Sequence, residues 1–572
     1  MSAFYDIWIS KRVPEYRRML NDPWVNGLHY SLSLPEGKTD YITVEESETY
    51  SLIAVGAFYE PIDIGHLFSH CINYAEGKEH TFTDPAGHYI LFLKNKANAN
   101  WYVFTNRLGT YHAYYRQEQG NNAISTYYLG LAKSSNDKQL DWEGITGFMG
   151  MGFFPLNTTY LKNIKILEPA SHYCFDAKLN LLHKRRYWEW KHEPSVKNTQ
   201  ENVGLLHNIM QSSLRFAVHN KRVALPISGG LDSRTVAGAV TDSHIGVASL
   251  WGFSYGYSNT SVETDIAGKI AVARSIPFSH YTVPNYLFDK IDLVTDSVEL
   301  FQYIDGTRQA CMSELLEQNS EVVIGGHWGD VWMDDMGVTD GTDMGMLEAF
   351  RKKIIKRGSA WLLNEVCSPY FSKGKEYLDS YFSSYISKYS YIADPDFRMK
   401  IFKSDQWSFR WTLASIRMYQ AGAFPILPFY DKRIVDLFTT IPTSLVKGRN
   451  LQIEYIKKYQ PDLARIKWQE YGSNLYLYKW LNNRNIIYRV INKVRRMLSK
   501  EAQIRRPWEV FYLNPEGRKC LETKLLNPIF NNIVPAEKIN SLLDMFYKDP
   551  SAGNGYTISM LLTFSQFIST VF

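Results

Sequence analysis

The feature that most constrains this chain is the stretch RVALPISGGLDSRTVAG, residues 222–238, in which an apolar run ends at two glycines before a helix-like segment. Three further apolar runs follow it, and a helix-like segment, VETDIAGKIAVARS (262–275), separates the first two. Strands that alternate with helices in this way form a parallel sheet with helices on both faces. The sequence therefore predicts an α/β fold here, with its later strands in GVASLWGF (246–253), FSHYTV (278–283) and SEVVIGG (320–326).

The part of the chain before this region has a different pattern. Short runs rich in Tyr, Phe, Val and Ile predict a strand-dominated α+β region, and they are SLIAVGAFY (51–59), GHYILFLKN (87–95), NWYVFTN (100–106) and HYCFDAKLNLLHKRRYW (172–188). The segment DWEGITGFMGMGFFP (141–155) predicts a short helix broken by glycines, and KHEPSVKNTQEN (191–202) predicts a linker. Residues 345–572 are predicted to be mostly helical, with a packed terminal helix in TISMLLTFSQFISTVF.

Composition excludes several classes of function. The net charge of +5 is mild for 572 residues and lacks the dense basic stripe of a nucleic-acid binder. The five cysteines include no CxxC pair, so we expect free thiols in a reducing compartment rather than a zinc site. Without a signal-peptide pattern or an apolar run of about 18 residues, the expectation is a cytoplasmic protein that binds neither membrane nor nucleic acid.

The loop from Ser228 to Ser233 lies where an apolar strand meets a helix. Its glycines let the backbone approach an anion, and the free N–H groups of the new helix point at that anion. Ligands of open parallel sheets bind beyond the carboxyl ends of the strands, so the position also indicates a phosphate site. Asp232 would suit a Mg²⁺ that bridges phosphate oxygens. The alternative is an ordinary turn in which Asp232 and Ser233 cap the helix.

The six residues SGGLDS after an apolar strand resemble the pyrophosphate-binding loop of the asparagine synthetase family, whose members cleave ATP between the α- and β-phosphates. The resemblance implies that ATP and its pyrophosphate contact Ile227, Ser228, Gly229, Gly230, Leu231, Asp232 and Ser233. The stretch 249–271 resembles the family's second strand and helix, which implies that backbone at Trp251 borders adenine. The stretch FPILPFYDKRIVDLFTTIPTSL (424–445) resembles a helix of the family's C-terminal part.

A second glycine-rich turn, VVIGGHWGDVWMDD (322–335), resembles the family's second nucleotide loop. The resemblance implies that Gly325 and Gly326 approach the nucleotide and that Asp330 is a second Mg²⁺ ligand. His327 stands where the synthetases have a glutamate, and it is either a general base for the incoming amine or a structural histidine. Asp334 and Asp335 are predicted to form a solvated turn.

Two features depart from the glutamine-dependent members of this family. Position 2 is Ser2, where those enzymes expose a nucleophilic cysteine, so we expect that the N-terminal part does not hydrolyse glutamine. The stretches AVGAFYE (54–60) and NRLGTYHAYY (106–115) still resemble elements of the glutaminase domain of those enzymes. The residues before about 45 look like an addition to that domain. The family's catalytic lysine has no clean match, because Lys447 and Lys457 only bracket its place.

The resemblance as a whole implies an N-terminal-nucleophile (Ntn)-hydrolase-like α+β sandwich over residues 1–190. A doubly wound, parallel-sheet ATP pyrophosphatase domain with a helical C-terminal part would follow over 200–572. The expected activity is an ATP- and Mg²⁺-dependent amide ligase that acts on a carboxylate and on ammonia or an amine, either as a homodimer or with a partner that delivers substrate. The alternatives are a macrolactam synthetase acting on a peptide, amidation of a surface-polysaccharide sugar acid, and a non-catalytic nucleotide-binding module.

Overall fold

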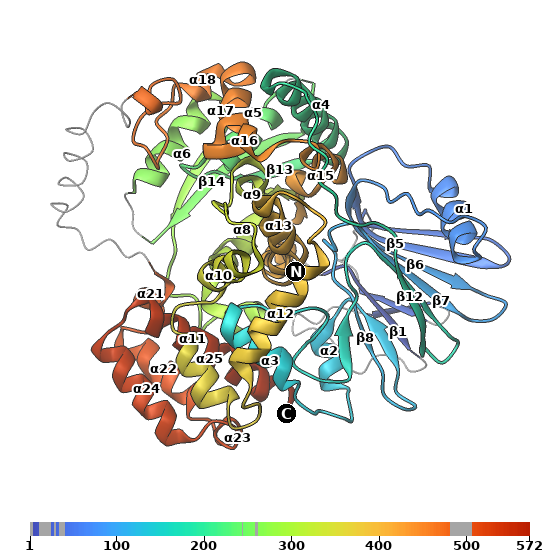
Figure 1. The fold of residues 1–572 in the computed structure, drawn as a ribbon, viewed down its shortest axis with the longest axis vertical. Coiled ribbons are helices and arrows are strands. Elements are labelled where there is room, and N and C mark those ends of the chain that lie inside the picture. The colour runs from blue at the N-terminus through green and yellow to red at the C-terminus, as the bar shows by residue number, and fades with distance from the viewer. Residues whose placement is uncertain are drawn as a thin grey trace.

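The structure, a computed structural model, describes residues 4–10, 24–27, 30–33, 40–242, 244–257, 261–480 and 506–572. Ser2 lies outside the described residues. Figure 1 shows antiparallel strands on one side of the molecule, a parallel sheet among helices on the other, and the last helices, α21 to α25, gathered at one end. The described residues thus form a mixed α/β structure with one parallel and two antiparallel sheets.

The two antiparallel sheets have six described strands each. Side chains from both sheets, such as Ile7, Ile53 and Ile90, belong to one buried hydrophobic cluster. The first sheet has the order β10-β8-β9-β1-β3-β2 and is made of Ile164–Ile166, Tyr114–Arg116, Ala123–Ser125, Asp6–Ser10, Tyr30–Ser33 and Trp24–Gly27. The second has the order β12-β11-β7-β6-β5-β4 and is made of Leu181–Arg186, Ser171–Phe175, Trp101–Thr105, Gly87–Asn95, Tyr50–Phe58 and Ile42–Glu46. The residues before about 45 contribute to this core, because β1 is an interior strand between β9 and β3.

Three helices belong to this antiparallel region: α1 (Ile64–Ala75), α2 (Tyr128–Lys133) and α3 (Trp142–Met151). The expectation that glycines break the helix at 141–155 is wrong, since α3 runs unbroken over ten residues. A side chain at Gly147 would come within 2.3 Å of Pro155, and one at Gly150 within 2.8 Å of Leu378. These glycines are required for close packing, and the left-handed Gly152 (φ 85°) ends the helix.

The parallel sheet has five strands in the order β15-β14-β13-β16-β17, made of Phe278–Thr282, Ser249–Gly256, Arg222–Pro226, Val322–Ile324 and Phe424–Ile426. The predicted second strand is shifted by three residues, because β14 continues to Gly256 in order to pair with β15. The fifth strand lies inside the stretch predicted to be helical. There, β17 pairs with β16 before α15 (Lys432–Phe438) begins.

Helices surround this sheet and make up most of the rest of the chain. Those that flank the strands in sequence are α4 (Thr199–Val218), α5 (Leu231–Val240), α6 (Val262–Ala273), α7 (Ile291–Val298), α8 (Ser313–Asn319) and α9 (Gly329–Met333). The later ones include α10 (Asp343–Ile354), α12 (Gly374–Lys388), α13 (Pro395–Phe402), α16 (Thr443–Val446), α17 (Asn450–Tyr459) and α18 (Pro461–Ala464). A π-helical segment, Lys403–Thr412, continues α13 directly.

The C-terminal helices are α21 (Pro507–Phe511), α22 (Pro515–Leu525), α23 (Pro528–Asn531), α24 (Ala536–Lys548) and α25 (Ala552–Val571). The apolar α25 packs against α22, α23 and α24, and its central residues are buried. Among the described residues, no helix is long and apolar enough to cross a membrane. The apolar end of the chain is therefore a packed helix, as predicted.

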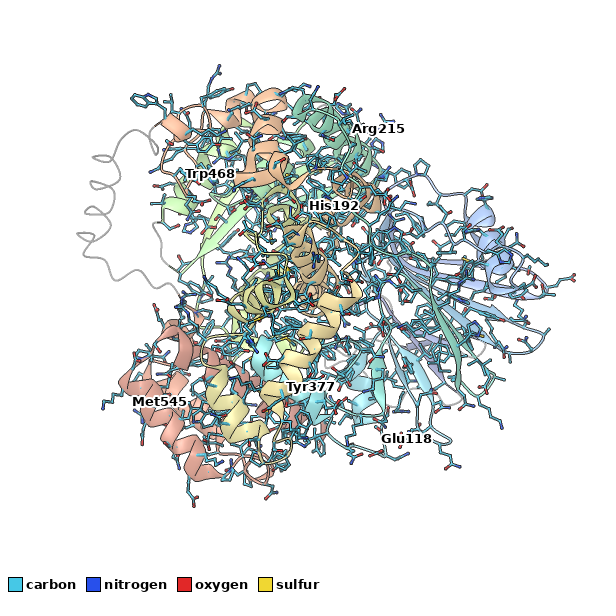
Figure 2. All side chains as sticks on the ribbon, in the orientation of Figure 1. Glu118, His192, Arg215, Tyr377, Trp468 and Met545 are labelled. Carbon is cyan, nitrogen blue, oxygen red and sulfur yellow. The ribbon has the colours of Figure 1, made fainter. Side chains whose placement is uncertain are left out.

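The segment predicted as a linker is held at its start by the helical part. The ring of His192 stacks on Phe397 at 4.0 Å between ring centres, and Figure 2 shows His192 surrounded by side chains. The backbone N–H groups of Glu193 and Ser195 donate to the carbonyls of Thr439 and Thr440. The backbone of residues 192–195 therefore lies against the C-terminal end of α15 and does not form a free linker.

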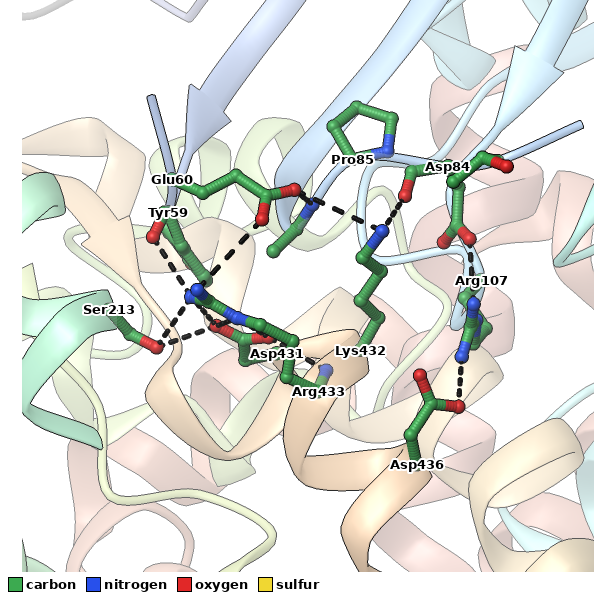
Figure 3. Close-up of polar contacts among 12 residues, drawn as sticks. Tyr59, Glu60, Asp84, Pro85, Arg107, Ser213, Asp431, Lys432, Arg433 and Asp436 are labelled. Carbon is green, nitrogen blue, oxygen red and sulfur yellow. Dashed lines mark hydrogen bonds and ion pairs between the residues drawn. The ribbon is translucent and has the colours of Figure 1, made fainter. Parts of the chain in front are cut away.

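Charged residues join the antiparallel region to α15 (Figure 3). Arg107 pairs with Asp84 of its own region at 2.8 Å and also with Asp436 of α15. Arg433 donates to the Tyr59 carbonyl at 3.0 Å and to the fully buried Asp431 at 2.6 Å. We call this contact the α15 seam, defined by Glu60, Asp84, Arg107, Asp431, Lys432, Arg433 and Asp436.

We expect Arg433→Met to destabilise the protein by about 3 kcal/mol, because it leaves the buried Asp431 carboxylate without its cation. The matched control is Arg351→Met, which breaks an exposed pair with Asp379 and should cost less than about 1 kcal/mol. Urea unfolding of both variants measures the difference. Equal, small losses in the two variants would contradict a structural role for the seam.

Candidate functional site

The candidate site lies at the carboxyl ends of β13 and β16. These adjacent parallel strands are the point at which the strand order reverses, because β14 and β15 extend the sheet on one side and β17 on the other. Such a reversal leaves a crevice in which open α/β sheets bind ligands. A cavity of about 470 Å³ opens there, and the loop after each strand contributes to its wall.

The first loop is braced by its own serines. The Ser233 hydroxyl accepts a hydrogen bond from the Ser228 backbone N–H at 2.9 Å and lies 2.9 Å from the Ser228 hydroxyl. Gly230 then precedes the first turn of α5 as its N-cap, without a side chain over the helix end. No side chain caps the backbone N–H groups at the start of α5, which are the kind of donors that bind anions.

The second loop touches the first at backbone level. A side chain at Gly326 would come within 3.1 Å of the Ser233 backbone nitrogen, and one at Gly329 within 2.6 Å of the Asp232 carboxylate. Between them, Trp328 adopts a left-handed conformation (φ 77°), which is costly for a residue with a side chain. Small residues and a strained turn thus bring the two loops together.

Asp232 is half-buried and is neutralised from α17. Gln452 donates to its carboxylate at 3.0 Å, and the Arg449 guanidinium forms an ion pair with the same oxygen. Burial, with a further contribution from Asp330, raises the Asp232 pKa to about 6 against the opposing effect of Arg449. A further cation beside Asp232 would favour the charged form of this carboxylate.

The second loop also positions Arg449. The Asp334 carboxylate accepts from the Arg449 backbone N–H at 3.2 Å, and Asp335 accepts from that of Gly448 at 3.4 Å. The prediction that Asp334 and Asp335 form a solvated turn is wrong, since both are half-buried and hold the start of α17. Sequence reasoning missed Arg449 and Gln452, although the cations and amides between Lys447 and Lys457 were the available signal.

The donor set fits a magnesium ion that takes most of its ligands from phosphates and water. Asp232 and Asp330 both line the cavity and interact electrostatically. Nowhere in the described ranges do three or more His, Cys, Asp or Glu side chains gather as a metal site. Mg²⁺ is bound in proteins by one or two carboxylates together with substrate phosphates, so two aspartates suffice only when such a ligand is present.

His327 lines the cavity beside the two aspartates. Its Nδ1 is buried without a hydrogen-bond partner among the described residues, and its ring lies edge-on to Tyr419 at 6.3 Å. Burial lowers the His327 pKa to about 4, with Arg308 acting in the same direction and Asp330 opposing it. The imidazole is therefore neutral near pH 7, as a general base must be, and its low pKa also makes it a weaker proton acceptor than a free histidine.

The cavity lining also contains residues that the sequence did not identify. Lys403, Trp407, Trp411 and Thr412 come from the π-helical segment, and Arg308 and Glu263 lie near the β14 side. The Arg308 guanidinium lies 5.0 Å from the centre of the Tyr255 ring. These residues were missed because their stretches carry no glycine-rich motif.

The structure brings most of the predicted site residues to one cavity but not all. Its lining includes Ile227, Ser228, Asp232, Ser233, Gly326, His327 and Asp330, whereas Gly229, Gly230, Leu231, Gly325 and Trp251 are not part of it. Trp251 stacks on Phe253 at 5.0 Å, and it is Phe253 and Ser254 that reach the cavity. Arg234 points away from the cavity and donates to the carbonyls of Leu463, Ile466 and Lys467.

Comparison with known proteins gives one distant relative. No family model matches the chain. Asparagine synthetase [glutamine-hydrolyzing] 1 of Bacillus subtilis (strain 168) is 23% identical over 249 residues, which are 40% of this chain and 38% of that enzyme. The match therefore spans well under half of that relative's length.

Among solved structures, the glutamine phosphoribosylpyrophosphate amidotransferase from B. subtilis, complexed with ADP and GMP, overlaps 49% of this chain and 85% of its own. The identity is 7% and the TM-score 0.18, too low to assign a fold. What the comparisons establish is a distant similarity to an asparagine synthetase.

We expect the His327 ring to remain neutral from pH 8 down to about pH 5, because its folded-state pKa is near 4. In the unfolded chain the pKa of histidine is about 6.5. Protons therefore bind preferentially to the unfolded state between those values, and the free energy of unfolding falls as the pH drops below about 6.5.

Proton NMR of the histidine rings, with the His327 signal assigned by its loss in His327→Gln, measures this pKa directly. The same variant should show a shallower loss of stability between pH 6.5 and 4. A His327 signal that titrates near 6.5 would contradict the buried environment described above.

Proposed function

We propose that this chain is an ATP-dependent ligase that activates a carboxylate as its acyl-adenylate and then forms an amide. The observation that carries the proposal is the meeting of Asp232 and Asp330, from two strand-end loops, in one cavity where the strand order reverses. The distant similarity to an asparagine synthetase supports the same class of reaction.

In the first step, an oxygen of the substrate carboxylate would bond to the α-phosphorus of ATP, and the bond to the β-phosphate would break, releasing pyrophosphate. The Ser228–Ser233 loop would bind that pyrophosphate through the uncapped backbone N–H groups at the start of α5. Magnesium bound by Asp232 and Asp330 would neutralise part of the phosphate charge. Arg449, already paired with Asp232, adds a fixed positive charge at the same end of the cavity.

In the second step, the nitrogen of ammonia or of a substrate amine would attack the acyl carbon, and AMP would leave. A neutral His327 at the cavity wall can receive the proton that the amine loses. We propose ammonia or an amino group of the substrate as the nitrogen donor. The carboxylate and the amine are thus the two substrates that we propose for this site, besides ATP.

We expect Asp232→Asn and Asp330→Asn each to lower pyrophosphate release by about 10²-fold or more, because each removes a negative charge that the cation requires. Asp544→Asn is the control. It removes a carboxylate from the exposed side of α24 that does not line the cavity, so its activity should stay within about threefold of wild type.

Pyrophosphate release with ATP, Mg²⁺ and a panel of carboxylates measures all four proteins. Near-wild-type release by either cavity variant would refute the assignment of these aspartates. A wild-type protein that binds ATP and releases no pyrophosphate with any carboxylate in a broad panel would favour a non-catalytic nucleotide-binding module.

We expect His327→Ala to spare ATP–pyrophosphate exchange and to depress amide formation by roughly 10²- to 10⁴-fold. Adenylation needs no base, since the substrate carboxylate is already ionised, whereas the attacking amine must lose a proton. Both half-reactions are measured on the same preparation beside the melting temperature. Equal losses in both, together with a lower melting temperature, would instead show that His327 is structural.

A further inference from the structure

The peptide that joins Ile426 to Leu427, at the end of β17, is hydrogen-bonded on both sides. Its carbonyl accepts from the Gly325 backbone N–H at 2.9 Å, and its N–H donates to the Tyr59 hydroxyl at 2.8 Å. In a planar trans peptide these two groups point in opposite directions. This one peptide therefore links the second loop to the antiparallel region.

Tyr59 is held in place by its own backbone. Its N–H donates to the Ala86 carbonyl at 2.8 Å, and its carbonyl accepts from Arg433 at 3.0 Å (Figure 3). Tyr59 and Leu427 are both buried, and a buried backbone N–H that lacks a partner is costly. The Tyr59 hydroxyl therefore stabilises the peptide at the end of β17 in its present orientation.

The ring of His327 lies against the backbone of Gly325. A side chain at Gly325 would come within 2.6 Å of His327 Nδ1 and within 3.3 Å of the Leu427 side chain. Gly325 thus lies between the imidazole and Leu427, while its N–H is bound to the Ile426 carbonyl. A displacement of the Ile426–Leu427 peptide would therefore move the backbone on which the imidazole rests.

The rest of the second loop is anchored by other contacts. A side chain at Gly326 would come within 3.1 Å of the Ser233 backbone nitrogen, and the Trp328 indole donates to the Ser404 hydroxyl at 3.2 Å. Neither contact involves Tyr59 or β17. Loss of the Tyr59 hydroxyl should therefore disturb His327 more than the parts of the loop that face the first loop.

We infer that Tyr59 is a positioning residue for His327: its hydroxyl holds the end of β17 and, through Gly325, sets where the imidazole lies at the cavity. Tyr59 does not line the cavity itself, so it acts only through its neighbours. The consequence for amide formation rests on the proposed function, whereas the placement of the ring does not. The antiparallel region thereby contributes to the second half-reaction through a single hydroxyl.

The test variant is Tyr59→Phe, which removes the hydroxyl and keeps the ring. Its matched control is Tyr160→Phe. Tyr160 is equally buried, and its hydroxyl donates to the Leu300 carbonyl at 2.6 Å, a bond that involves neither β17 nor the second loop.

Two readouts are taken on the full chain. Proton NMR follows the His327 ring signals, assigned by their loss in His327→Gln, and the ring current of the neighbouring Tyr419 makes them sensitive to ring position. We expect Tyr59→Phe to displace these signals and Tyr160→Phe to leave them unchanged. Tyr59→Phe should also lower amide formation by about tenfold or more while ATP–pyrophosphate exchange stays within about threefold.

Leu427→Val provides a second route to the same displacement, because it shortens the side chain beside Gly325 and retains the backbone N–H that Tyr59 binds. It also keeps the inference testable if Tyr59→Phe does not fold. Unmoved His327 signals in the folded variants would overturn the inference.

An equal displacement in Tyr160→Phe would also overturn it, because the effect would then be a general loosening of the protein. So would equal losses in both half-reactions of Tyr59→Phe. A wild-type protein that forms no amide would defeat the proposed function, and the NMR comparison would then decide the positioning role on its own.

Discussion

The half-buried carboxylate of Asp232 is the constraint on which the rest of the site depends. A carboxylate removed from water needs a cation or hydrogen bonds to stay charged. Arg449 and Gln452 provide them from the start of α17, more than two hundred residues further along the chain. Because Asp334 holds the backbone of Arg449, the two loops and α17 form one connected unit. Asp232 is therefore held in place by residues from three separate parts of the sequence.

The two loops can meet only because the strands before them are neighbours. β13 pairs with β16 in parallel, so both chains leave the sheet at the same edge. Gly326 and Gly329 then allow the second loop to approach Ser233 and Asp232 without a side chain in between. The order of the strands and the glycines of the second loop therefore together determine which groups surround Asp232.

Part of this arrangement could be read from the sequence. The glycine pairs after apolar strands located both loops, since those residues act through local backbone geometry. The three-residue shift of β14 and the strand β17 could not be read, because both are decided by pairing with β15 and β16 rather than by local pattern. Arg449, Gln452 and Lys403 were missed for a similar reason: their positions depend on how distant helices pack, and no short motif marks them.

The antiparallel region contacts the helical part of the chain through two of its turns. Its stretches AVGAFYE and NRLGTYHAYY resemble glutaminase turns, and they contain Glu60 and Arg107 of the α15 seam. The carbonyl of Tyr59 and the pair between Arg107 and Asp436 tie the same turns to α15. Since only the short 3-10 helix Pro428–Tyr430 separates β17 from α15, a shift of these turns would be transmitted to the edge of the parallel sheet. These side chains are thus engaged in holding the sheet beside the cavity, which gives them a structural use that does not depend on glutamine hydrolysis.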